Sequence, residues 1–167
     1  MEFRRLIFAP PDELNVDSIL KFVNDRIKAG DRIICIDSMT LADFGKQIWV
    51  DTKRLCRALK SLAEINKIAI FLSVHPKKGW IGSAEKASLD DLSLGASLAQ
   101  AVTDAFWIGG GDVEEKFCES SCGKFRALVN KMIFVKKVRN GLGMGSAIGF
   151  WFNHETLCFE ERGLILD

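Results

Sequence analysis

The sequence has no apolar run long enough to cross a bilayer, and it carries almost no net charge. Its longest apolar runs, such as residues 68–74, fall far short of the roughly 20 residues that a membrane-spanning helix needs. No apolar signal segment with a small-residue cleavage site opens the chain. We therefore expect a cytoplasmic protein without a membrane partner.

The formal net charge of the 167 residues is only +1. This excludes attraction of the whole molecule to nucleic acid, so any such contact has to come from a local basic patch. The hydrophobic content of 48% excludes a disordered chain and is enough for a sizeable core. We expect one globular domain over residues 1–167.

The five cysteines are odd in number and irregularly spaced. This pattern argues against a disulfide framework, and we expect reduced thiols. A zinc site built from Cys118, Cys122, His154 and Cys158 is an alternative, but the spacing is loose and the last two residues lie on a predicted hairpin. Plain loop cysteines are the preferred interpretation.

Alternating helical and strand patterns fill the first part of the chain. Apolar residues recur on one helical face between Val16 and Lys28, and Gly30 is expected to end this helix. Short runs that are apolar on both sides indicate strands of a parallel sheet with helices on both faces. The expected strands are 5–8, 33–36, 68–74 and 105–108, and the expected helices are 16–28, 52–65 and 94–102.

After Gly109 the pattern changes to short strands joined by turns that contain Gly or Asn, which is typical of antiparallel hairpins. The predicted fold class is α/β, with a mainly parallel sheet over about residues 1–108 and an antiparallel extension over about 127–161. Two stretches, 77–88 and 109–126, are predicted as loops within this domain. The expected antiparallel strands are 128–137, 146–152 and 156–159.

Polar residues at strand ends are candidates for function, because ligands of open parallel sheets bind beyond the carboxyl ends of the strands. Asp37 follows the apolar run 33–36, and His75 follows the run 68–74. Lys137 and Arg139 end the first antiparallel strand. Each has a plainer interpretation: an Asx turn for the acid, a local hydrogen bond for the histidine, and solvated charge for the cations.

The order of these residues along the chain resembles the motif order of the replicative hexameric helicases of the DnaB and Twinkle type, a branch of the RecA-like ATPases. Residues 32–38, Arg-Ile-Ile-Cys-Ile-Asp-Ser, look like the Walker B strand, and the helix at 54–63 is similar to the one that follows it. Residues 71–78, Phe-Leu-Ser-Val-His-Pro-Lys-Lys, resemble the sensor strand, and 89–105 resemble the return from the DNA-facing loop. Residues 137–141 match the Lys-x-Arg-Asn-Gly element of the family.

The resemblance implies a RecA-like, P-loop NTPase fold and an ATP-dependent helicase that moves along single-stranded DNA in DNA replication. It implies that Asp37 holds the Mg²⁺ of bound ATP and that His75 senses the γ-phosphate. Lys137 and Arg139 would act on the nucleotide of the neighbouring subunit in a homohexameric ring. A cation supplied in this way neutralises charge on the transferring phosphoryl group.

The loop 77–88 resembles the DNA loop that lines the central channel of these rings. Lysine side chains match phosphates and an aromatic ring stacks on any base, which favours single-stranded DNA as the ligand. An ordinary solvated loop is the plainer interpretation. The residues expected to bind DNA are Lys77, Lys78, Trp80 and Lys86.

One element of the family is absent from the sequence. The Walker A motif, Gly-x-x-x-x-Gly-Lys-Ser/Thr, occurs nowhere in the 167 residues, and the catalytic glutamate of the family belongs to the same upstream portion. We therefore expect the C-terminal part of the core, inactive alone, without tight ATP binding, and monomeric or weakly dimeric. The alternatives are a RecA-like ATPase of the plasmid-replication or circadian type, and a non-catalytic module that binds DNA or a partner.

Overall fold

The computed structural model describes residues 14–166, and the strand predicted at 5–8 lies outside these residues. The described chain forms two compact units. The helical unit consists of residues 14–78 and 92–102. The strand unit consists of residues 79–91 and 103–166.

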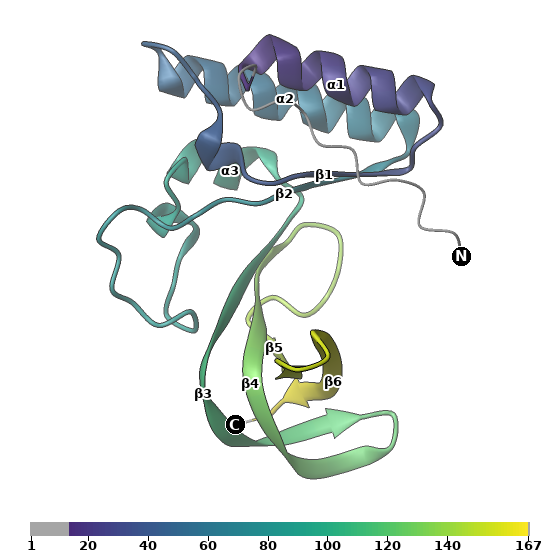
Figure 1. The fold of residues 1–167 in the computed structure, drawn as a ribbon, viewed down its shortest axis with the longest axis vertical. Helices are drawn as coiled ribbons and strands as arrows, with labels where there is room; N and C mark the ends of the chain where they lie inside the picture. The colour runs from purple at the N-terminus through teal and green to yellow at the C-terminus, as the bar shows by residue number, and fades with distance from the viewer. Residues whose placement is uncertain (1–13, 167) are drawn as a thin grey trace. The chain divides into compact units, whose positions relative to one another are not determined.

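The helical unit contains a two-stranded parallel sheet. Strands β1 (Ile33–Ile36) and β2 (Ala69–Leu72) pair from Ile33 opposite Ala69 to Ile36 opposite Leu72. Parallel strands need a long crossover, and helix α2 supplies it between them (Figure 1). The helices of this unit are α1 (Val16–Lys28), the short 3₁₀ helix η2 (Met39–Leu41), α2 (Ile48–Asn66) and α3 (Gly95–Ala101).

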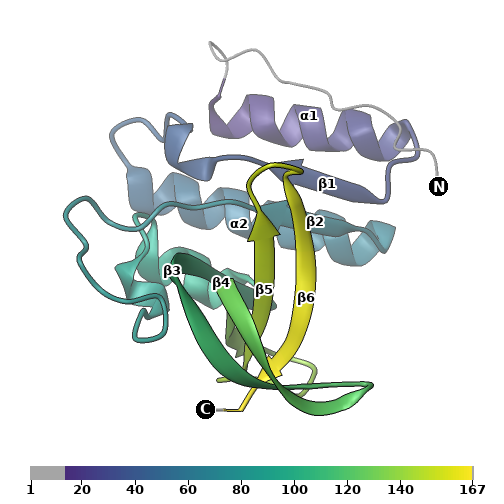
Figure 2. The same ribbon diagram turned by 60° about the horizontal axis from the view of Figure 1, so that its bottom comes forward.

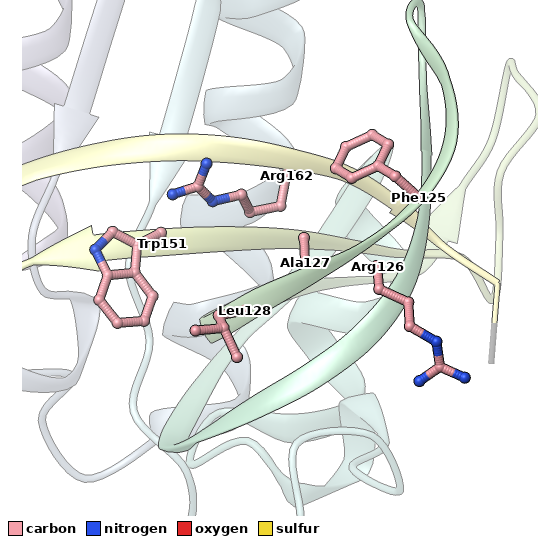
Figure 3. A pocket seen from close by; sticks show the side chains of 6 residues that line it. All are labelled: Phe125, Arg126, Ala127, Leu128, Trp151 and Arg162. Atoms are coloured by element: carbon pink, nitrogen blue, oxygen red, sulfur yellow. The ribbon is translucent and has the colours of Figure 1, made fainter.

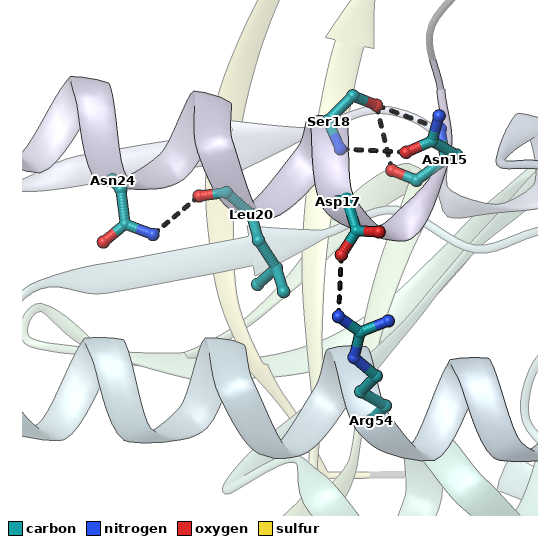
Figure 4. A network of polar contacts seen from close by, with 6 residues as sticks. All are labelled: Asn15, Asp17, Ser18, Leu20, Asn24 and Arg54. Carbon is teal, nitrogen blue, oxygen red and sulfur yellow. Dashed lines mark hydrogen bonds and ion pairs between the residues drawn. The ribbon is translucent and has the colours of Figure 1, made fainter.

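The start of α1 is fixed by side chains that the sequence places at the right positions. Asn15 caps the helix by accepting a hydrogen bond from the backbone N–H of Ser18, and the Ser18 hydroxyl accepts one from the backbone N–H of Asn15 (Figure 4). The neighbouring Asp17 carboxylate lies 2.7 Å from the guanidinium of Arg54 in α2. This ion pair joins the two helices at the surface.

The core of the helical unit lies between the two long helices and one face of the sheet. Its buried residues include Val23 from α1, Ile34 from β1 and Leu55 from α2. The opposite face is open: Ile33 is 65% exposed and Phe71 is 54% exposed. The prediction of helices on both faces of the sheet is therefore wrong for the described residues, in which both long helices cover the same face.

The strand unit is an antiparallel sheet in which each strand pairs with the next along the chain. The fourth strand returns to the first, with Cys118 opposite Ile165, so the sheet closes on itself. Figure 2 shows the long first hairpin and the shorter second one. The strands are β3 (Asp104–Ser120), β4 (Gly123–Val138), β5 (Ala147–Asn153) and β6 (Cys158–Ile165), and the 3₁₀ helix η3 (Leu89–Asp91) precedes them.

The pairing of the described strands is thus mostly antiparallel, and the predicted mainly parallel sheet is not what forms. The segment 105–108 was expected in the parallel part, but it lies in β3 and pairs antiparallel with β4 from Asp104 onward. The predicted loop 109–126 is the outer half of the β3–β4 hairpin. A tight turn at Gly123 (φ 108°) joins these strands, and a tight turn permits only antiparallel pairing.

The cysteines do not gather into one site. Cys118 is buried in β3, whereas Cys122 and Cys158 are exposed. Among residues 14–166 no three His, Cys, Asp or Glu side chains are arranged to hold a metal ion. No helix in this part of the chain is long and apolar enough to cross a membrane.

Candidate functional site

Asp37 and His75 lie on neighbouring segments at the carboxyl end of the β1–β2 pair. Beyond the last paired residues, the N–H of Ser73 donates to the carbonyl of Ile36 at 3.0 Å, and the N–H of Met39 donates to the carbonyl of Ser73 at 2.9 Å. Asp37 therefore lies within a segment that backbone hydrogen bonds hold against the chain leading to His75. This is the edge of the sheet where the sequence predicts a ligand site.

The Asp37 carboxylate is exposed to solvent and makes no hydrogen bond or ion pair with any other residue of 14–166. The plainer interpretation of Asp37, an Asx turn, is therefore wrong among these residues, whereas the nearby Asp43 does form one: its carboxylate accepts from the N–H of Gly45 at 2.8 Å. The peptide bond between Asp37 and Ser38 is cis. The neighbouring Ser38 hydroxyl is buried without a hydrogen-bond partner among the described residues.

One free carboxylate cannot form a complete protein cage for a metal ion. Mg²⁺, however, keeps several waters and is commonly held by one or two carboxylates together with substrate phosphates. Asp37 fits this partial role, because its carboxylate has no competing partner among residues 14–166. A phosphate-binding backbone would have to come from another segment, since the Walker A motif is absent from the sequence.

The backbone of His75 connects three segments of the helical unit. Its N–H donates to the Thr40 hydroxyl at 3.1 Å, and its carbonyl accepts from the N–H of Ser93 at 3.1 Å. Thr40 belongs to the segment that follows Asp37, and Ser93 leads into α3. The imidazole is exposed and makes no hydrogen bond with the other described side chains, so it is open to a ligand.

Lys137 and Arg139 lie together at the end of β4. Lys137 pairs with Ala105, and the N–H of Arg139 donates to the carbonyl of Thr103 at 3.1 Å. Lys137 is half-buried and Arg139 is exposed. A backbone hydrogen bond of 2.8 Å, from the N–H of Gly145 to the carbonyl of Val135, holds the glycine-rich turn that follows.

The four predicted site residues thus form two pairs. Asp37 and His75 lie on neighbouring segments of the helical unit, and Lys137 and Arg139 lie at the end of β4 in the strand unit.

Most of the predicted DNA loop 77–88 belongs to the segment 79–91, which packs on strands of its own unit. The ring of Trp80 lies 5.0 Å from that of Trp107 in β3, with 52° between their planes. Trp80 is half-buried, which does not fit the plainer interpretation of an ordinary solvated loop. The three lysines expected to bind DNA, Lys77, Lys78 and Lys86, are exposed.

Lys136 is a residue that sequence reasoning did not select. It is the extra residue of a β-bulge, because Val135 pairs with Phe106 and Lys137 with Ala105. Its ammonium donates to the backbone carbonyl of Glu85. Burial lowers the pKa of Lys136, although the nearby Glu85 carboxylate acts in the opposite direction. No sequence signal marks a bulge at this position, so this contact appears only in the structure.

A shallow hollow of about 340 Å³ lies on the strand unit (Figure 3). Its two guanidinium groups are already paired: Arg126 lies 2.9 Å from Glu115, and Arg162 lies 2.9 Å from Glu160. The hollow therefore offers an apolar wall without unbalanced charge. Its lining residues are Phe125, Arg126, Ala127, Leu128, Trp151 and Arg162.

Comparison with known proteins identifies the fold and leaves the family open. No family model matches the sequence, and no curated protein matches it. A solved structure, described as the structure of a DnaB-like replicative helicase and its interactions with primase, matches 87% of this chain with a TM-score of 0.60 and 19% sequence identity. The match covers 34% of that helicase chain, so this chain spans about a third of its length. The chain therefore has a DnaB-like fold over most of its residues.

Proposed function

We propose that this chain works as part of an ATP-driven, ring-forming DNA helicase motor that moves along single-stranded DNA. The observation that carries the proposal is the joint position of Asp37 and His75 at the carboxyl end of the parallel strands, in a DnaB-like fold. The order of the sequence motifs supports the same function. ATP and Mg²⁺ are the proposed cofactors.

Asp37 is the proposed metal-binding residue. Its carboxylate would help to hold, directly or through water, the Mg²⁺ that accompanies bound ATP. The metal supplies positive charge against the charge that develops on the phosphates. Backbone hydrogen bonds at Ile36 and Met39 hold the segment that carries this carboxylate, so the charge starts from a defined place at the strand end.

His75 is the proposed sensor of the γ-phosphate. An imidazole N–H at this strand end is a suitable donor to a phosphate oxygen. Because the His75 backbone is bonded to both Thr40 and Ser93, a movement of this residue shifts the start of the segment that leads into α3. The loop expected to contact DNA lies between His75 and Ser93 in sequence, so nucleotide state and DNA contact share one connected segment.

Lys137 and Arg139 are the proposed cations that act in trans. A guanidinium presents a planar fork to phosphate oxygens, whereas an ammonium acts as a point charge. Together they would neutralise the phosphoryl group on the nucleotide of a neighbouring subunit. This function requires a ring, which is proposed to be a homohexamer.

The open face of the β1–β2 pair supports the idea that further polypeptide completes the core. Parallel sheets occur almost only with both faces covered, yet Ile33 and Phe71 are exposed. Among the described residues β1 and β2 pair only with each other, so both outer edges are available to further strands. The phosphate-binding Walker A motif, which this sequence lacks, would belong to that further polypeptide.

The test is Mg²⁺-dependent ATP hydrolysis by a complete motor in which this chain is joined to a Walker A-bearing half of a DnaB-like helicase. Asp37→Asn removes the charge that holds the metal and is expected to lower turnover by about 10²–10³-fold. Asp25→Asn is the matched control, because Asp25 is an exposed acid on α1 away from the strand ends. Equal turnover of the Asp37→Asn and Asp25→Asn motors would reject the assigned role.

The absence of Walker A favours a second candidate, a module that binds single-stranded DNA without hydrolysing ATP. The exposed Lys77, Lys78 and Lys86 would contact phosphates in both cases. The two functions separate in the joined motor: a module binds DNA but confers no DNA-stimulated ATP hydrolysis.

A further inference from the structure

We propose that Lys136 is a positioning residue that holds the segment 79–91 against strands β3 and β4. The position of the segment on these strands sets its affinity for single-stranded DNA. The inference rests on the proposed function, because it assumes that the segment binds DNA. It adds a role for a lysine that lies outside the family motif.

Three contacts seat the segment, which we call the seated loop. The ring of Trp80 packs on Trp107. Ala84 lies so close to Gly109 that a Cβ at position 109 would overlap the Ala84 methyl group. The Lys136 ammonium donates to the carbonyl of Glu85. The contacts lie at residues 80, 84 and 85, so they define the path of the first half of the loop over the strands.

The seated loop covers a cross-strand pair of aromatic residues. Trp107 in β3 is opposite Phe134 in β4, and they are only 7% and 9% exposed. Trp80 packs directly on Trp107, and the site of the Gly109 contact lies beside the Phe134 ring. Removing the loop would expose apolar aromatic surface to water, which is unfavourable. The loop is therefore a part of this unit's packing.

The β-bulge explains why Lys136 can reach the loop. A bulge inserts one residue into a strand and redirects its side chain. The Lys136 ammonium lies 5.2 Å from the centre of the Phe134 ring, so the side chain runs over the pair that the loop covers. Its donor then meets the Glu85 carbonyl in an environment where burial disfavours a free charge.

These contacts fix the backbone around Lys86, one of the residues expected to bind DNA. Glu85 precedes it and is held by Lys136, and Ala87 follows it and is buried. The N–H groups of Lys86 and Ala87 both donate to the carbonyl of Ser83 at 3.0 Å, which closes a turn around Lys86. The exposed Lys86 side chain thus starts from a fixed backbone, so binding a phosphate does not first have to order the loop.

The experiment compares the DNA affinity of the 167-residue chain with that of five variants, by fluorescence anisotropy with a labelled oligothymidylate at low salt. Lys136→Met removes the donor, and Gly109→Ala displaces Ala84 without any change of charge. Both are expected to weaken binding by about 3–10-fold, since each releases side chains that then have to be ordered. Lys136→Arg keeps a donor and is expected to bind within about twofold of wild type.

Two controls separate positioning from other causes. Lys124→Met removes an exposed lysine on the distant turn of the β3–β4 hairpin and is expected to change affinity by less than about twofold. Adding Ala84→Gly to Gly109→Ala removes the overlapping methyl group and should restore binding. Hydrogen exchange of residues 81–88 should be faster in Lys136→Met and in Gly109→Ala than in wild type, and normal again in the double variant.

Several outcomes would overturn the inference. Wild-type affinity in Gly109→Ala with a loss in Lys136→Met would mean that Lys136 contacts DNA directly. Faster exchange of the loop with unchanged affinity in both variants would show that the seat has no role in binding. A wild-type chain that does not bind the oligothymidylate would instead reject the DNA-binding part of the proposed function. Melting temperatures are recorded for all variants, and the double variant keeps the test valid if Gly109→Ala is unstable.

Discussion

The backbone N–H of His75 donates a hydrogen bond to the hydroxyl of Thr40, 3.1 Å away, and so joins the segments that leave β1 and β2. The first of these segments contains Asp37, the proposed metal-binding residue. The second leads into the loop that carries the exposed lysines. One hydrogen bond thus connects the proposed nucleotide site with the proposed DNA-binding segment.

Thr40→Val removes the acceptor of this bond while keeping the shape of the side chain. We expect the free energy of unfolding to fall by about 0.5–1.5 kcal/mol and the His75 amide to exchange several times faster with solvent. Thr40→Ser keeps the hydroxyl and should behave as wild type. Native-state hydrogen exchange measures both quantities, and an unchanged His75 rate in Thr40→Val would show that the bond does not hold this strand end.

Stability should decrease at alkaline pH because of Cys56. Burial raises the pKa of this thiol to about 11, whereas in the unfolded chain it ionises near about 8.5. Between these values the unfolded state binds fewer protons, so the free energy of unfolding falls as pH rises, by up to about 1.4 kcal/mol per pH unit from this group. Urea unfolding from pH 8 to 11 measures the slope.

The control for this slope uses two cysteine variants. Cys56→Ala should lose the contribution, although the smaller side chain lowers stability at every pH. Cys35→Ala should keep it, because Cys35 is exposed. Identical slopes for the two variants would contradict the burial of the Cys56 thiol. In the native protein Cys56 should also react with a thiol reagent much more slowly than the exposed cysteines do.

The elements of the helical unit were predictable because their periodicity is strong. The patterns at 16–28 and 33–36 match α1 and β1, since a helix and a strand that pack on one core carry clear apolar faces. The positions of Asp37 and His75 at strand ends were likewise predictable, because each residue directly follows an apolar run. Their roles in binding nucleotide remain predictions.

The outer half of the β3–β4 hairpin was missed for a physical reason. Most side chains between Gly109 and Arg126 are exposed, so charge and glycine replace the apolar alternation that signals a strand. The seated loop could not be foreseen either. It depends on the bulge at Lys136 and on the close approach of Ala84 to Gly109, which join residues far apart in sequence.

The chain alone is expected to bind ATP weakly. Backbone N–H groups of a Walker A loop normally supply most contacts to the phosphates, and the sequence contains no such motif. Calorimetric titration with ATP and Mg²⁺ should therefore give no dissociation constant below about the millimolar range. A micromolar value would show that a different phosphate site exists.

The chain alone is also expected to be a monomer or a weak dimer. Sedimentation equilibrium measures this, and a stable hexamer would contradict a partial core.

The trans action of Arg139 predicts complementation between inactive subunits. In the joined motor, subunits with Arg139→Ala still hold a nucleotide, and subunits disabled at the Walker A lysine still supply the cation. Mixed rings of the two should regain part of the activity that neither shows alone. Mixtures that stay inactive although they form rings would mean that Arg139 acts within its own subunit.

The rate of DNA-stimulated ATP hydrolysis by the joined motor with Arg139→Ala tests the helicase assignment most directly. The rate should fall by about 10³–10⁵-fold, while nucleotide affinity in the same subunit stays within about twofold of wild type. Arg126→Ala, which removes an exposed and ion-paired arginine of the same unit, should keep the wild-type rate. A wild-type rate with Arg139→Ala would show that this cation is solvated charge at a strand end, and it would contradict the proposed motor function.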